Sequence, residues 1–375
     1  MKSSPPRDPG DDLAPASLAA RRAYTGLELP HLAGVPVDPA SARGNVEGMV
    51  GYAQVPVGIA GPLVLRGDAE GSYTVPFATT EGTMVASYQR GMKVIAESGG
   101  ARVRVMREGY ALFPLLAYPG LDEAIAAGRW VDAHRGALVT AAEATTRHGK
   151  VTELHGEILG QRLLLTLRMH TGDAQGANMV NRAAQAVVGA ISSATAPTRV
   201  ALHGYDPEKR ASTRHWRGRW VVASVRVPAS VVAARLRTTS AALAHLWADY
   251  QLAYARMGTA NHALQVANGL AAIYVATGQD AAYTAESCAC TLSLEDDGGE
   301  LVATLDLPSL HAATVGGGTQ KGTAAECQRI IGARSARELA CVMAGALLAG
   351  DLNLAASFLG DDFAGAHERL GRSRP

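Results

Sequence analysis

Glu81 is the acid in this sequence whose setting points most directly to chemistry, because small and apolar residues surround it. Apolar residues at helical spacing predict a helix that Thr79 or Thr80 caps and Gly99-Gly100 ends, so Glu81 is predicted to lie in its first turn. A carboxylate there could transfer a proton to a substrate. It could equally cap the helix and complement its dipole.

Asp280 is a second candidate acid. It follows an expected long helix, Gly258–Thr277, which Gly278 is expected to end. The carboxyl end of a helix carries partial negative charge, so the protonated form of a nearby acid is favoured. An ordinary solvated loop Asp is the alternative interpretation.

Two glycine-containing segments could present backbone amides to a ligand. Gly172–Asn178 joins an expected strand over 161–170 to an expected helix that runs to about residue 194. Amides at such a helix start can hold phosphate, although an ordinary strand-to-helix connection has the same spacing. Gly316, Gly317 and Gly318 form either a similar cradle or a tight turn.

The composition predicts a protein with a large buried core. The chain has 375 residues, 47% of them hydrophobic, and a formal net charge of +1. This balance gives no indication of nucleic-acid or membrane partners. No secretory signal is recognised, so a cytoplasmic location is expected, with disorder over residues 1–15. The apolar run Leu339–Gly350 is too short to span a bilayer and predicts a buried helix.

The cysteines and the common short motifs exclude several classes of protein. Four cysteines lack the spacing of a zinc site or a disulfide framework, so buried thiols and no metal are expected. The glycine pattern typical of a Rossmann fold is absent, as are the nucleophile elbow, the HExxH pair and the Walker A loop. Common hydrolase and nucleotide-hydrolase interpretations are therefore disfavoured.

Longer motifs carry a resemblance to a known family. Five segments match in order and spacing: Asn45–Leu65, Ala78–Gly82, Gly172–Asn178, Ala276–Ala282 and Thr314–Thr319. Together they resemble 3-hydroxy-3-methylglutaryl-CoA reductase, and the resemblance covers most of residues 40–375.

The resemblance implies an α+β fold: a large helix-rich domain around a long central helix, 258–277, with an inserted small ferredoxin-like α/β sandwich domain. The large domain would comprise residues 16–110 and 201–349. The insert, 111–200, would bind NADPH, and residues 350–375 would form a mobile tail. The family also implies a homodimer with active sites between subunits.

Four catalytic residues follow from the family motifs: Glu81, Lys209, Asp280 and His367. Hydride addition to a thioester carbonyl creates an oxyanion, which a protonated Lys209 would stabilise. Glu81 would deliver a proton to that oxygen, with Asp280 coupled to both groups. His367 would protonate the departing thiolate. A second hydride would convert the aldehyde to the alcohol.

The resemblance also assigns binding residues. Those expected to contact the dinucleotide are Asp173, Asn178, Gly316, Gly317 and Gly318, together with Thr146 and Arg147 at the 2′-phosphate that distinguishes NADPH. Those expected to contact the acyl-CoA substrate are Ser87, Arg90, Arg210 and Asn268, with Leu112 and Leu202 in the acyl pocket.

The acyl pocket departs from the family pattern. Leu112 and Leu202 stand where the family has an Arg and a Ser, and no lysine occurs from residue 210 to 320. Burying a carboxylate without such partners is costly. The substrate is therefore either 3-hydroxy-3-methylglutaryl-CoA or a less acidic acyl thioester, on CoA or a carrier. A non-catalytic acyl-CoA- or NADPH-binding homologue is the third hypothesis.

Overall fold

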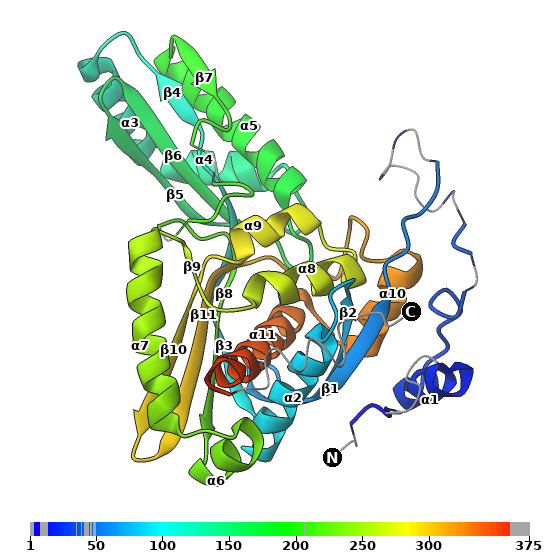
Figure 1. The fold of residues 1–375 in the computed structure, drawn as a ribbon. Coiled ribbons are helices and arrows are strands. Elements are labelled where there is room, and N and C mark those ends of the chain that lie inside the picture. Colours follow the sequence, from blue (N-terminus) through cyan, green and yellow to red (C-terminus); the bar gives the residue numbers. More distant parts are fainter. Residues whose placement is uncertain are drawn as a thin grey trace.

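The computed structural model describes residues 4–7, 14–34, 36–38, 40, 45, 47, 50–205, 207–212 and 214–360 (Figure 1). These residues form a mixed α+β fold, which confirms the predicted class. The predicted domain boundaries remain predictions.

The main part of the sheet is built from five strands in the order β3-β8-β11-β10-β9. Their bounds are β3 Ala101–Leu112, β8 Gly218–Val227, β9 Asn261–His262, β10 Cys290–Asp297 and β11 Glu300–Leu310. The hairpin β1 Val57–Gly67 and β2 Gly71–Ala78 joins this sheet where β1 runs parallel to β3. Buried and half-buried residues alternate along β8 and β11, as expected when one face of a strand packs on a core.

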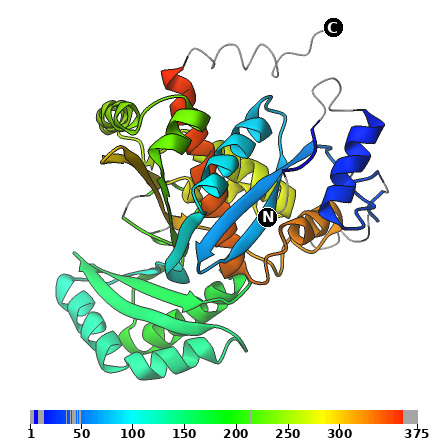
Figure 2. The same ribbon diagram turned by 90° about the horizontal axis from the view of Figure 1, so that it is seen from below.

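A second group of strands continues from the end of β3, where Tyr110–Leu112 pair with β6. The group lies at one end of the molecule in both views (Figures 1 and 2). Its strands are β4 Leu115–Ala117, β5 Lys150–Leu159, β6 Arg162–His170 and β7 Arg199–Ala201, in the antiparallel order β7-β4-β6-β5. Its helices are α3 Leu121–Ala133, α4 Arg135–Glu143 and α5 Ala177–Thr195, which pack against β5 and β6.

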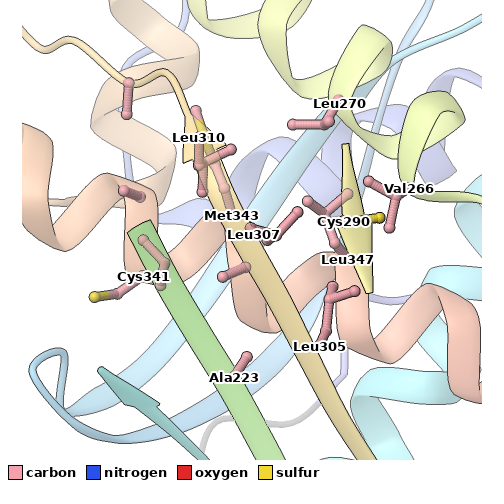
Figure 3. Close-up of a cluster of buried hydrophobic side chains, with 14 of the residues drawn as sticks. Ala223, Val266, Leu270, Cys290, Leu305, Leu307, Leu310, Cys341, Met343 and Leu347 are labelled. Carbon is pink, nitrogen blue, oxygen red and sulfur yellow. The ribbon is translucent and has the colours of Figure 1, made fainter. Parts of the chain in front are cut away.

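The longest helix, α11 Ala336–Leu359, is the centre of the core. Its middle turns are buried on every side, between the sheet, α8 Val266–Thr277 and α2 Met84–Glu97. Figure 3 shows Met343 and Leu347 of α11 among Leu305 and Leu307 of β11 and Leu270 of α8. By length and composition α11 could cross a membrane, but nearly all of it is buried inside the protein. The helix predicted at Leu339–Gly350 is thus confirmed.

Three predictions about helices need correction. The expected helix Gly258–Thr277 is two elements, because Asn261–His262 pair with β10 and only Val266–Thr277 is helical. The central helix is therefore α11. Residues 350–359 were predicted to begin a mobile tail, but they are the last turns of this helix. Burial of their apolar side chains in the core stabilises these turns. The rest of that tail lies outside the described residues.

The remaining elements are short or peripheral. They are α1 Pro15–Thr25, α6 Ala229–Val231, the π-helix η2 Val232–Leu236, α7 Ser240–Met257, the 3₁₀ turn η3 Ala281–Tyr283, α9 Thr284–Ser287 and α10 Gly322–Ile331. The predicted disorder over residues 1–15 falls mostly outside the described residues. Of the four free cysteines, Cys290, Cys327 and Cys341 are buried and Cys288 is half-buried.

Candidate active site

Glu81 lies in the loop between β2 and α2, three residues before the helix begins. The prediction that it occupies the first turn is therefore wrong. The Oγ1 of Thr79 accepts the Glu81 N–H at 3.0 Å, which folds the loop into a turn. Thr83, at the N-cap position, has a left-handed φ of 71°. The helix thus starts later than the sequence pattern indicates, and the Glu81 carboxylate is exposed rather than used as a cap.

Asn268 on α8 binds the Glu81 carboxylate. Its Nδ2 donates to Oε2 at 2.9 Å and to Oε1 at 3.2 Å. The start of α8 is held from α11, where Oδ1 of Asp351 accepts the Gln265 N–H at 2.8 Å. Asp351 is fully buried, and burial raises its pKa to about 7. A buried acid on the core helix therefore anchors the helix that holds Glu81.

Lys209 and Asp280 form an ion pair, with 3.0 Å between Nζ and Oδ2. Both side chains remain more than 40% exposed, so the pair is open to a ligand. Asp280 also caps η3, because its Oδ1 accepts the Ala282 N–H at 3.0 Å. Gly278 ends α8 with a φ of 69°, as predicted. The Asp280 carboxylate thus accepts from two donors, the Lys209 ammonium and the Ala282 N–H.

The Asn268–Glu81 pair and the Lys209–Asp280 pair lie toward opposite ends of α8. Asn268 is in its first turn, Asp280 follows its last residue, and Thr277 is about 14 Å along the axis from Asn268. Among the described residues, no hydrogen bond or ion pair joins Glu81 to Lys209 or Asp280. One chain therefore presents the acid and the lysine as separate groups.

Five polar residues behind Lys209 form a cluster that the sequence motifs did not single out: Tyr110, Glu208, Arg217, Tyr283 and Glu286. Glu286 has small neighbours in the sequence, but Arg217 stands among Arg214, His215 and Arg219, so no local pattern marks the cluster. Burial by itself would raise the pKa of Glu286, but hydrogen bonds from Arg217 and His311 lower it to about 2. Burial raises the pKa of Tyr110 to about 12 and raises that of Tyr283 further.

The two glycine segments meet beside Asp280. Ala174 and Val315 form a β-bridge, and the Asp173 carbonyl accepts the Thr314 N–H at 3.0 Å. The 314–319 loop also touches the end of α8, where a Cβ on Gly278 would come 2.5 Å from the Gly318 carbonyl oxygen. The structure therefore brings the predicted dinucleotide segments together next to the Lys209–Asp280 pair.

The other predicted nucleotide residues occupy one neighbouring surface. Thr146 accepts the N–H groups of His148 and Gly149 at 3.2 Å each, which closes the loop that exposes Arg147. This loop packs on α5 next to the exposed Asn178: Gly149 lies so close to α5 that a Cβ on it would meet the Met179 sulfur at 2.7 Å.

Asp173 has a structural role in this chain. Its Oδ1 accepts the Ala336 N–H at 2.8 Å, so this carboxylate caps α11.

The predicted substrate residues fall into two groups. Arg90 and Arg210 are exposed. Beside Glu81 there is a cavity of about 320 Å³, which residues of the 79–89 segment line, including Gln89. Ser87 is 8% exposed, and its Oγ accepts from Gln265 at 3.1 Å and from Asn353 at 2.8 Å. It belongs to a polar contact between helices.

The two leucines predicted to line an acyl pocket lie in or against the core. Leu112 is 2% exposed within the main core, and Leu202 packs partly buried against it. Leu112 therefore has almost no exposed surface, whereas Leu202 keeps part of its surface exposed, and their place in an acyl pocket stays a prediction. His367 lies outside the described residues.

The site therefore combines an exposed acid, a lysine–aspartate pair and adjoining glycine loops on an α+β scaffold. This scaffold matches the solved class II 3-hydroxy-3-methylglutaryl-CoA reductase of Streptococcus pneumoniae bound to NADPH, with a TM-score of 0.77. The match has 22% sequence identity and covers 92% of this chain and 97% of the other. The likeness at this identity concerns the fold.

Sequence comparison then gives the family. The model of the hydroxymethylglutaryl-coenzyme A reductase family matches residues 16–372. The reductase of Methanothermobacter thermautotrophicus is 36% identical over 92% of this chain and 90% of its own length. That of Aeropyrum pernix is 37% identical over 96% and 91%. This chain belongs to the hydroxymethylglutaryl-coenzyme A reductase family of oxidoreductases, and the resemblance predicted from its motifs is confirmed.

Proposed function

We propose that this protein reduces 3-hydroxy-3-methylglutaryl-CoA to mevalonate with NADPH. The observation that carries the proposal is the Lys209–Asp280 ion pair at 3.0 Å, open to solvent and adjacent to the glycine loops that the family uses for its nucleotide. A cation and the nucleotide segments in one place are what hydride transfer to a thioester carbonyl requires.

In this mechanism, Lys209 binds the carbonyl oxygen of the substrate. Negative charge develops on that oxygen as hydride arrives, and a fixed ammonium stabilises it. Asp280 orients the ammonium through the ion pair. Glu81, oriented by Asn268, supplies the proton to the oxygen. When the intermediate releases CoA, the oxygen returns its proton to Glu81 as the C–S bond breaks, and His367 protonates the departing thiolate. Lys209 serves again as the aldehyde is reduced.

The residues that are present fit NADPH. Gly172, Gly316 and Gly317 have left-handed backbones, and a Cβ at any of them would meet nothing within 4 Å, so their amides are open to a phosphate. Arg147 is exposed on the neighbouring loop, where it can pair with a 2′-phosphate. When bound, NADPH supplies the hydride. Asp173 contributes by capping α11 and fixing the 314–319 loop.

The inserted domain, residues 111–200, is proposed to bind the nucleotide. Its order of elements, β4-α3-α4-β5-β6-α5-β7, and its strand order β7-β4-β6-β5 support a ferredoxin-like arrangement.

A homodimer is proposed to complete the site. Within one chain no hydrogen bond or ion pair joins Glu81 to Lys209 among the described residues, and α8 separates their partners. A second copy docked at this face would bring the acid of one subunit to the lysine of the other.

The test is an assay of purified protein with NADPH or NADH and a panel of acyl-CoAs, followed by absorbance at 340 nm and product mass. NADPH-dependent formation of mevalonate from the glutaryl thioester is expected. Turnover of only neutral acyl-CoAs would replace the substrate assignment. Saturable nucleotide binding without any turnover would instead support a binding protein.

Two variants test the roles within this assay. Arg147→Ala should raise the KM for NADPH about 10-fold and leave that for NADH unchanged. His367→Ala should slow thioester reduction but spare reduction of the aldehyde, since only the first requires thiolate protonation. Equal loss of both would contradict that role.

A further inference from the structure

The main chain of Lys209 has an unusual conformation. Its φ is 58°, in the left-handed region that residues other than glycine seldom adopt. Such a conformation persists only where surrounding contacts fix it. Those contacts therefore bear on where the ammonium of Lys209 is aimed.

Glu286 provides one of these contacts. Its Oε2 accepts the Lys209 N–H at 3.1 Å, across 77 residues of sequence. The same carboxylate receives a bidentate ion pair from Arg217, with Nη2 donating to Oε2 at 2.6 Å and Nε to Oε1 at 2.8 Å. Arg217 is fully buried and Glu286 is 3% exposed. Because Arg217 fixes the carboxylate in two places, the acceptor for Lys209 has one orientation.

A second line of contacts reaches the residue before Lys209. The Nη1 of Arg217 donates to the Tyr110 hydroxyl at 3.1 Å, which lies 3.0 Å from the Tyr283 hydroxyl. Tyr283 in turn donates to Oε1 of Glu208 at 2.9 Å. The peptide that joins Glu208 to Lys209 is thus held on both sides by groups that lead back to Arg217.

The ammonium of Lys209 meets the same cluster. Its Nζ lies 5.2 Å from the centre of the Tyr283 ring, within the range of a cation–π contact, and 3.0 Å from Asp280. Tyr283 belongs to η3, the turn that Asp280 caps. One residue thus contacts the cation directly and, through Glu208, steadies the backbone that carries it.

We propose that Arg217, Glu286 and Tyr283 are positioning residues for Lys209: the buried Arg217–Glu286 pair holds its left-handed backbone, and Tyr283 links that pair to the ammonium. This proposal rests on the proposed reduction for its kinetic consequences, because positioning matters most where the ammonium must meet a developing oxyanion. The geometric part is independent of the reaction.

Glu286→Gln is the primary test variant, since it retains the shape and removes the charge. We expect kcat to fall about 100-fold for both the thioester and the aldehyde, with each KM within 3-fold of wild type. A merely structural role would not separate kcat from KM in this way. Glu338→Gln is the matched control: Glu338 is also buried, pairs with Arg334 and accepts a tyrosine hydroxyl, that of Tyr73. It should retain wild-type kcat.

A chemical readout makes the test independent of turnover. The chain has five lysines, so limited acetylation followed by peptide mass spectrometry can follow Lys209 alone. Lys150, which pairs with Glu143 at 2.7 Å, is the internal reference. Release of Lys209 from Asp280 in Glu286→Gln should raise its acetylation at least 3-fold relative to Lys150.

If Glu286→Gln does not fold, Tyr283→Phe decides, because it leaves no buried charge unpaired. It should lower kcat about 10-fold, whereas the control Tyr73→Phe should not. Unchanged kcat and unchanged Lys209 acetylation in a folded test variant would overturn the proposal, as would equal effects in the controls. If wild-type protein reduces no thioester, the proposed function fails, and the acetylation result alone decides the positioning role.

Discussion

Lys209 and Glu81 are both open to solvent, but the parts of the fold behind them differ. Behind Lys209 lies a buried ion pair, Arg217–Glu286, and a line of tyrosine hydroxyls. Behind Glu81 there is a loop turn and one amide donor, Asn268. Lys209 is therefore held in place by contacts within a single chain. Glu81 is held by fewer contacts, the Thr79 hydroxyl at its N–H and the Asn268 amide at its carboxylate.

The largest effect is expected from Lys209→Ala, which removes the cation proposed to face the developing oxyanion. We expect kcat to fall about 10³-fold for thioester and aldehyde alike. Steady-state rates with each substrate measure this, and Lys150→Ala serves as a control because that lysine is an exposed partner of Glu143. Retained aldehyde reduction would remove Lys209 from the second step.

Glu81→Gln is expected to have the next largest effect, about 10²-fold in kcat. The amide preserves the size of the side chain but cannot supply a proton. Steady-state rates of wild type and Glu81→Gln with each substrate measure the difference. A wild-type rate in Glu81→Gln would assign the proton donor elsewhere.

Asn268→Ala tests the difference between the two sites directly, because it keeps Glu81 and Lys209 and removes the donor that the described residues provide to the Glu81 carboxylate. A decrease of about 10-fold in kcat is expected, which is less than the decrease expected from Glu286→Gln beside Lys209. Asn268→Asp, which places two carboxylates together, should be worse than Ala. A larger decrease in kcat from Asn268→Ala than from Glu286→Gln would show that Glu81 depends more on its supporting contacts than Lys209 does.

The smallest effect on turnover is expected from Asp351→Asn, which acts on stability. The unfolded chain releases the Asp351 proton near pH 3.8, whereas the folded protein retains it to about pH 7. The unfolded state therefore binds fewer protons between these values, so this group lowers the free energy of unfolding as pH rises, by up to about 4 kcal/mol. The variant should lack this loss.

Urea unfolding of both proteins at pH 4.5, 6 and 7.5 measures the difference. An equal pH dependence in wild type and Asp351→Asn would show that the carboxyl ionises at the same pH folded and unfolded. A difference in the free energy of unfolding that grows with pH would show that the protonated Asp351 carboxyl holds the start of α8, which carries Asn268.

Local patterns predicted much of this molecule. The strand at 162–170, the helix after it, the buried helix of 339–350 and the glycine that ends α8 all follow from periodicity and from the backbone freedom of glycine. The family motifs named Glu81, Lys209 and Asp280, because the residue types and their spacing survive in the sequence. These features depend on neighbours within a few residues.

Tertiary contacts decided the rest. Asn261–His262 leave the helical pattern because β10 offers them a strand partner. Asp173, singled out for a nucleotide, caps a helix 163 residues away. Leu112 packs in the core and Leu202 packs against it, while their place in an acyl pocket stays a prediction. Arg217 meets Glu286 across 69 residues. No local pattern encodes such pairs, since burial and charge pairing are set by which elements the fold brings together.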